Sequence, residues 1–224
     1  MTAPQSPPTQ ISEQPPAGGG LSPRMVLALV VLLVIAGGVA LLTTNGTAHR
    51  AKAPGYDGSA ITPPQATPRL QLRNYTGEPV NLNRYRGKAV LVTFLYTHCP
   101  DVCPLIASNL RVALETMGPA QAARTQVIAV SVDPRGDTPK AVAAFLARHG
   151  MTGRMKYLVG SPRELARVWK AWGVGSSKDL EQPQFVNHTA IVYGIDASGK
   201  MTTVYEASFA PKEIAHDVPL LASS

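Results

Sequence analysis

The sequence of 224 residues predicts an α/β fold, on two observations. Strand-like and helix-like segments alternate from residue 69 to the end. The two most apolar segments, residues 88–96 and 126–132, are rich in β-branched side chains. Runs of this kind are typical of strands buried on both faces of a sheet. Their alternation with helical segments predicts a sheet that carries helices on both faces.

Each element follows from its own pattern. After Pro104 the apolar residues recur with helical spacing and predict a helix behind the first buried strand. The pattern then predicts a strand at 126–132, a helix at 138–149, a strand at 157–159, a helix at 162–172, a hairpin of strands at 189–195 and 201–205, and a last helix from Pro211. Early crossovers followed by a late hairpin predict a thioredoxin-like layout.

The N-terminal third predicts an anchor and a tether. Residues 1–24 begin with a Pro- and Gly-rich stretch and are expected to be a disordered cytoplasmic N-terminus. Residues 25–42 are uncharged and about as long as the shortest helix that crosses a bilayer. No Ala-x-Ala cleavage site follows, so we expect an uncleaved transmembrane anchor rather than a signal peptide. Residues 43–68 read as a flexible linker, and residues 69–224 as the folded domain.

Charge and cysteine content exclude two classes of protein. The 21 basic and 14 acidic residues give a net charge of +7. No run of one sign reaches five residues, whereas a nucleic-acid binder often gathers its basic residues into a stripe. We therefore expect no nucleic-acid partner. Only Cys99 and Cys103 are present, and a bridge between them would close a loop too short to add much stability. The pair is better explained by chemistry than by a disulfide scaffold.

The cysteines lie where a buried strand gives way to a helix, in the segment Thr-His-Cys-Pro-Asp-Val-Cys-Pro at 97–104. The positive end of a helix dipole favours thiolates, which are both nucleophiles and metal ligands. Two thiolates suit Cu(I) or Zn(II) better than Mg(II) or Ca(II). A plain surface disulfide is the alternative.

His188 is the candidate third ligand among five histidines. It stands directly before the strand at 189–195, whose entry loop would pack against the cysteine loop in a thioredoxin-like fold. His98 adjoins Cys99 and is expected to point away, and His216 has no partner in the sequence. A lone histidine is more often structural than a ligand, so spacing alone leaves the role of His188 open.

Several motifs in the same order resemble one family. These are the cysteine segment at 97–104, Tyr-Arg-Gly-Lys at 85–88, Ser-Val-Asp-Pro-Arg-Gly-Asp-Thr at 131–138, and His-Thr at 188–189. The chain resembles the SCO/SenC proteins, membrane-anchored copper chaperones for cytochrome c oxidase assembly. The resemblance implies that Cys99, Cys103 and His188 bind Cu(I) or Cu(II). It also implies that the cytochrome c oxidase copper-site (CuA) subunit is the partner, with an unidentified copper donor.

The resemblance also bears on location, and the sequence departs from the family at one position. It places the domain in the periplasm, and because the N-terminus does not look like a mitochondrial transit peptide, we expect a single-pass protein of a bacterial inner membrane. Asn187 stands where the family often has an acidic residue, which bears on copper affinity. Asp133 and Asp137 match the family's acidic loop, but turn formation and an N-cap before Thr138 are the expected roles.

The sequence leaves other functions open. A metallochaperone without turnover is the leading prediction, so we do not expect an enzyme in the usual sense. A thiol–disulfide oxidoreductase would use Cys99 to attack and Cys103 to resolve, although three residues separate the cysteines where redox motifs have two. A peroxiredoxin-like interpretation rests on Thr97 alone, and a structural membrane-tethered module is the remaining alternative.

Overall fold

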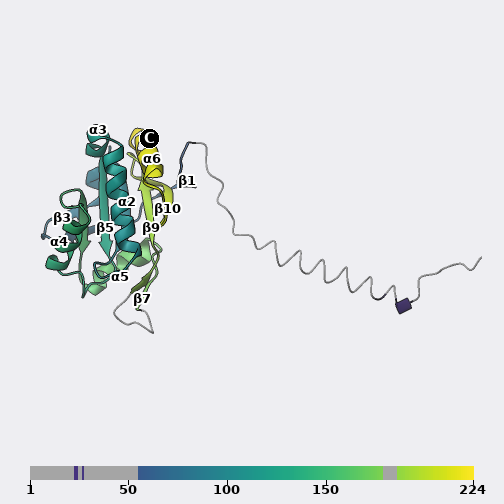
Figure 1. The fold of residues 1–224 in the computed structure, drawn as a ribbon, viewed down its shortest axis with the longest axis horizontal. Coiled ribbons are helices and arrows are strands. Elements are labelled where there is room, and N and C mark those ends of the chain that lie inside the picture. Colours follow the sequence, from purple (N-terminus) through teal and green to yellow (C-terminus); the bar gives the residue numbers. More distant parts are fainter. Residues whose placement is uncertain (1–22, 25–26, 28–54, 179–185) are drawn as a thin grey trace, which may run out of the picture. The chain divides into compact units, whose positions relative to one another are not determined.

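Eight strands form one sheet in the computed structural model, which describes residues 23–24, 27, 55–178 and 186–224 (Figure 1). The strand order is β1-β10-β9-β4-β5-β6-β2-β3. The bounds are β1 Ser59–Ala66, β2 Gln71–Asn74, β3 Pro79–Asn81, β4 Ala89–Leu95, β5 Thr125–Ser131, β6 Met155–Val159, β9 Ile191–Ile195 and β10 Lys200–Glu206. A small second sheet pairs β7 (Ser176–Lys178) with β8 (Val186–His188). The described residues from 55 onward belong to one compact unit, the folded unit.

The centre of the sheet is parallel and buried. All seven residues of β4 are buried, and β4 pairs with β5 in register from Ala89 opposite Thr125 to Leu95 opposite Ser131. β5 pairs with β6 in the same direction, whereas β9 runs antiparallel to β4 and forms the predicted hairpin with β10. The two strands predicted from their apolar runs are therefore confirmed to within a residue at each end.

Helices cover both faces of the sheet, as predicted. The helices are α2 Val102–Thr116, α3 Pro119–Ala123, α4 Pro139–Arg148, α5 Pro162–Ala171 and α6 Pro211–Ser223, with a short 3-10 turn at Leu82–Tyr85. Neighbouring residues of a strand point to opposite faces. A Cβ on Gly194 would lie 3.2 Å from Leu221 of α6, whereas the ring of Tyr193 packs on Trp172, just beyond α5. α6 and the end of α5 thus lie on opposite faces.

The strand β1 lies within the segment expected to be a linker. The linker prediction for residues 43–68 differs from the structure over Ser59–Ala66, which pairs antiparallel with β10 and buries Ala60 and Ile61. Pro63 and Pro64 obscure the strand in the sequence. They are tolerated because β1 is an edge strand, so the missing amide hydrogens cost no bonds inside the sheet.

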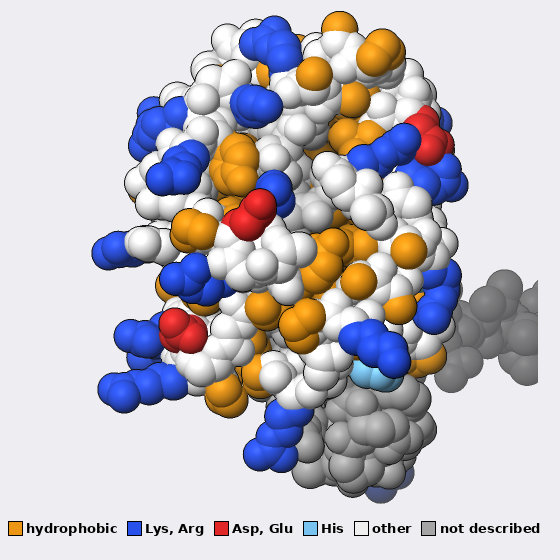
Figure 2. Space-filling view, turned by 90° about the vertical axis from the view of Figure 1, so that its left-hand side faces the viewer, with side chains coloured by type: hydrophobic (Ala, Val, Ile, Leu, Met, Phe, Trp, Pro, Cys, Tyr) orange, Lys and Arg blue, Asp and Glu red, His pale blue; other side chains and the backbone are white. Residues whose placement is uncertain are grey.

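The anchor prediction falls outside the part of the chain that the structure describes. Of residues 25–42 only Leu27 is described, and most of the predicted N-terminal tail and residues 43–54 are likewise not covered. Among the described residues, no helix has both the length and the apolarity that crossing a bilayer requires. Figure 2 shows one face of the folded unit, on which Lys and Arg side chains are interspersed with apolar and uncharged ones rather than gathered into a stripe.

Candidate metal centre

The cysteine loop connects the buried end of β4 to the first turn of α2. Asp101 caps the helix, because its carboxylate accepts a hydrogen bond of 2.6 Å from the amide of Val102. Cys99 lies in the loop and is 9% exposed, whereas Cys103 lies in the first turn of α2 and is fully buried. The Cys103 amide donates to the Cys99 sulfur over 3.3 Å, and neither cysteine is in a disulfide. The predicted strand–loop–helix setting is confirmed.

The two sulfurs differ in their electrostatics. The Cys103 side chain donates to Cys99 and, together with the Cys103 and Asp101 amides and against the opposing effect of burial, lowers the pKa of Cys99 to about 6. The same bond, together with burial, raises the pKa of Cys103 far above its ordinary value. Near neutral pH the reduced pair therefore consists of a thiolate at Cys99 and a thiol at Cys103. The helix terminus does not favour both thiolates equally, as position alone would suggest.

A buried carboxylate supports the loop from beneath. Asp137 is 4% exposed, and its Oδ1 accepts a 2.8 Å bond from the amide of Thr97. Its Oδ2 accepts bonds from the hydroxyls of Ser131 (2.6 Å) and Tyr157 (2.9 Å). Burial raises the pKa of Asp137, and these bonds act against that rise. One side chain thus joins the cysteine loop to β5 and β6.

Of the roles predicted for Asp133 and Asp137, the first is confirmed and the second is wrong. Asp133 forms the expected turn, because its carboxylate accepts from the amide of Arg135 at 3.2 Å. The expectation that Asp137 serves the turn or the helix cap is wrong: Thr138 caps α4, accepting from the amide of Ala141. Sequence reasoning missed the role of Asp137 because its partners come from three separate segments.

His188 closes the strand β8, and its side chain lies outside what the structure describes. Its backbone pairs with Ser176, and the next residue, Thr189, donates its amide to Gly175 over 3.2 Å. The chain then enters β9, where the carbonyl of Ile191 accepts from the hydroxyl of Thr93 near the end of β4. β9, the strand that follows His188, therefore begins beside the carboxyl end of β4, where the cysteine loop also begins.

The other described histidines have local contacts. His98 is exposed, and its Nδ1 lies 3.1 Å from the hydroxyl of Thr97. His149 follows α4, where its ring packs 4.6 Å from that of Phe145 and burial lowers its pKa. His216 contacts two aspartates that the sequence did not indicate.

Comparison with curated proteins finds mitochondrial relatives. The chain is 28% identical over 155 residues to the mitochondrial protein SCO1 homolog of Mus musculus, covering 66% of this chain and 53% of that protein. It is 30% identical over 138 residues to the mitochondrial protein SCO2 homolog of Bos taurus, covering 60% and 51%. The chain thus spans about half the length of these curated relatives.

Solved structures and a family model give longer matches. Apo Sco1 from Thermus thermophilus has a TM-score of 0.65 at 29% identity, covering 74% of this chain and 96% of that one. Copper-bound ScoI from Bradyrhizobium japonicum has a TM-score of 0.62 at 30% identity, covering 70% and 99%. These likenesses confirm the predicted thioredoxin-like fold. Since the SCO1/SenC family model matches residues 59–223, nearly the whole of the folded unit, this chain belongs to the SCO1/SenC family.

Proposed function

We propose that this chain binds copper through Cys99, Cys103 and His188 and delivers it to the CuA site of cytochrome c oxidase. The observation that carries the proposal is the reduced cysteine pair between the end of β4 and the start of α2, in which the Cys103 amide donates to the Cys99 sulfur. Two sulfurs in one helical turn form a soft donor set, which suits Cu(I). The similar ScoI of Bradyrhizobium japonicum is a copper-bound protein.

His188 supplies the third ligand in this proposal. Its support is the position of β9, whose first residue bonds to Thr93 beside the cysteine loop. An imidazole nitrogen complements two sulfurs for either oxidation state of copper. The buried carboxylate of Asp137 holds the amide of Thr97 and so fixes the start of the loop that carries Cys99.

The domain acts on the periplasmic side of a bacterial inner membrane in this proposal. The uncharged run at 25–42 supports the anchor, because it is about as long as the shortest helix that crosses a bilayer, and the resemblance to the membrane-anchored SCO/SenC proteins supports the periplasmic side. Residues 1–24 then lie in the cytoplasm, and the segment ahead of β1 tethers the domain. If deleting residues 25–42 left the protein in the membrane fraction, the anchor would be wrong.

The proposed client is the oxidase subunit that holds the CuA site. BsSco, whose fold this chain shares at a TM-score of 0.60, is named as a member of the Sco family of cytochrome c oxidase assembly proteins.

A thiol–disulfide exchange role is the second candidate. The difference in pKa between the cysteines favours it, because a low-pKa thiolate attacks and a neighbouring thiol resolves the mixed disulfide. Cys99 is also the more exposed of the two. In this role the Cys99 thiolate attacks a target disulfide and the Cys103 thiol, on losing its proton, releases the target from the mixed disulfide; two electrons and one proton pass to the target as Cys99 and Cys103 become a disulfide.

The deciding experiment is a Cu(I) titration of the reduced full chain against a competing chelator. We expect one copper per chain, lost in the C99S/C103S variant and weakened at least about tenfold in H188A. H98A is the matched control, because His98 is an exposed histidine within the cysteine segment itself. No binding above that of C99S/C103S would overturn the copper proposal, and reduction of a cysteine-pair substrate by the same preparation would then favour thiol exchange.

A further inference from the structure

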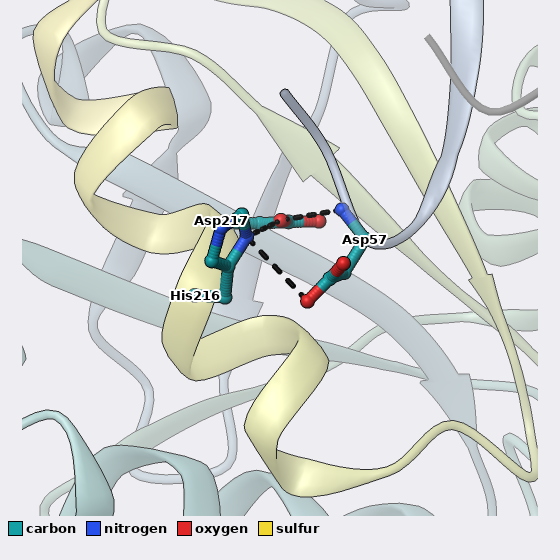
Figure 3. A group of neighbouring side chains, drawn as sticks. All are labelled: Asp57, His216 and Asp217. Carbon is teal, nitrogen blue, oxygen red and sulfur yellow. Dashed lines mark hydrogen bonds and ion pairs between the residues drawn. The ribbon is translucent and has the colours of Figure 1, made fainter. Parts of the chain in front are cut away.

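A second group of metal-ligating side chains lies where the start of the folded unit meets its last helix. Asp57 precedes β1, and His216 and Asp217 lie on α6, yet Figure 3 shows the three side chains converging. The His216 Nδ1 is 2.7 Å from the Asp217 Oδ1 and 3.5 Å from the Asp57 Oδ2. One ligand atom from each of the three lies within 4.8 Å of the other two. None of these residues belongs to the cysteine site.

Asp217 is held in place as a metal-binding carboxylate would be. Its side chain is fully buried, and Oδ2 accepts from the amide of Gly58 (2.8 Å) and the hydroxyl of Tyr205 (2.9 Å). Oδ1 accepts from the amide of Asp57 at 2.7 Å and uses its remaining lone pair toward His216. Supporting bonds of this kind orient ligands before a metal arrives.

The residue type at position 58 permits this close approach. A Cβ on Gly58 would lie 2.5 Å from the ring of Tyr205 and 2.6 Å from the hydroxyl of Thr203. Glycine therefore lets the backbone come near enough to donate to Asp217.

The other two side chains supply access. His216 is 54% exposed and Asp57 is 30% exposed, so an ion reaches the group from solvent and keeps room for water. The two carboxylates bring two negative charges to one imidazole nitrogen. A divalent cation at that point balances both charges, where an imidazolium balances one.

The geometry points to a binding site for one divalent cation of the zinc class, formed by Asp57, His216 and Asp217. One imidazole nitrogen and two carboxylate oxygens are ligands that Zn(II) accepts, and a water completes four-coordination. On binding, the Nδ1 proton that bonds to Asp217 is displaced to solvent or to Nε2, so that Nδ1 ligates the cation and Nε2 carries the one ring proton. The site is independent of the proposed copper function, since it shares no ligand with it.

The consequence is a cation that joins the two ends of the folded unit. Asp57 enters β1, and α6 ends the chain, so a shared ion bridges segments 160 residues apart. A ligand that binds only the folded state stabilises it. We therefore expect zinc to raise the thermal midpoint of the folded protein.

The test is a Zn(II) titration by calorimetry on the full chain carrying C99S/C103S, which removes the sulfur ligands. We expect one zinc per chain, with affinity at least about tenfold weaker in H216A and also weakened in D57N. H98A and E206Q are matched controls, because each removes an exposed side chain of the same kind elsewhere. Both are expected to bind zinc as the parent does.

Two results would overturn the site. Zinc binding that H216A leaves unchanged would place the ion elsewhere. If the parent bound no zinc, the contacts among Asp57, His216 and Asp217 would serve only to hold the start of the folded unit against α6. Circular dichroism of zinc-free H216A separates loss of the site from loss of the fold. Because the background lacks both cysteines, either result leaves the copper proposal standing on its own titration.

Discussion

At the scale of single residues, the cysteine pair works through an asymmetry that a motif does not express. Both cysteines occupy similar places in the sequence, but Cys103 is fully buried at the base of α2 and donates to Cys99. The charge of the reduced pair therefore resides on Cys99. The spacing predicted the pair, whereas the division of labour needed the three-dimensional contact.

The reactivity of Cys99 is predicted to follow this division. The alkylation rate of the reduced protein should reach half its maximum near pH 6, because the pKa of Cys99 is lowered to about 6 from an ordinary value of 9.0. In C103A the midpoint should move upward, since the main donor is gone. Mass spectrometry of the alkylated protein against pH measures both. A midpoint that stays near pH 6 in C103A would contradict the hydrogen bond as the cause.

The same shift has a consequence for stability. The folded pKa of Cys99 lies below the unfolded one, so its contribution is complete above pH 9 and disappears as the pH falls through 6. Between these limits the free energy of unfolding of the reduced protein should rise with pH. Urea unfolding at several pH values measures this slope, and C99S, which cannot titrate, should flatten it.

Asp137 is predicted to be the most sensitive polar position beneath the loop. D137A removes the acceptor of Thr97, Ser131 and Tyr157 together, and a buried unsatisfied donor costs about 1–3 kcal/mol. We expect a loss of about 3 kcal/mol or more in the free energy of unfolding. Y157F loses one bond and should cost about 1 kcal/mol. Equal urea midpoints for the two variants would show that the other two bonds contribute nothing.

At the scale of elements, the sequence predicted the strands and helices that a local pattern of apolar or turn residues determines. The apolar runs predicted β4 and β5, and the hairpin of β9 and β10 followed from its turn. β1 was missed because Pro63 and Pro64 mark it as a linker, and only its pairing with β10 makes it a strand. Asp137 and the Asp57–His216–Asp217 group were missed for the same reason: each depends on a contact between segments distant in sequence, Thr97 with Asp137 and Asp57 with Asp217.

The start of α5 offers a prediction at this scale. Ser161 accepts from the amide of Glu164, and the Glu164 carboxylate accepts in return from the amide of Ser161. Removing such a cap costs about 1 kcal/mol, so S161A should lower the free energy of unfolding by that amount. S208A, at an exposed turn, should change it by less than about 0.5 kcal/mol. Indistinguishable urea curves for the two variants would contradict the cap's contribution.

At the scale of the whole molecule, the folded unit begins before the limit that the composition predicts. A chain starting at Arg69 lacks β1 and with it the amides of Asp57 and Gly58 that serve the buried carboxylate of Asp217. Compared with a chain starting at Arg50, we expect it to lose about 3 kcal/mol or more in the free energy of unfolding, because hydrogen bonds to charged groups contribute about 1.5–3 kcal/mol each. Equal stability in urea would mean that β1 is dispensable.

The bonds between Asp217 and the start of β1 also determine how the unit carries mechanical load. Tension on the chain ahead of Asp57 first meets α6 and Tyr205, through the carboxylate that accepts from both backbone amides. β10 and β9 lie between β1 and β4, so two strands separate the pulled edge from the strand that carries the cysteine loop. A pulling force applied to the chain ahead of Asp57 should therefore strain α6 before it disturbs the sulfurs of Cys99 and Cys103.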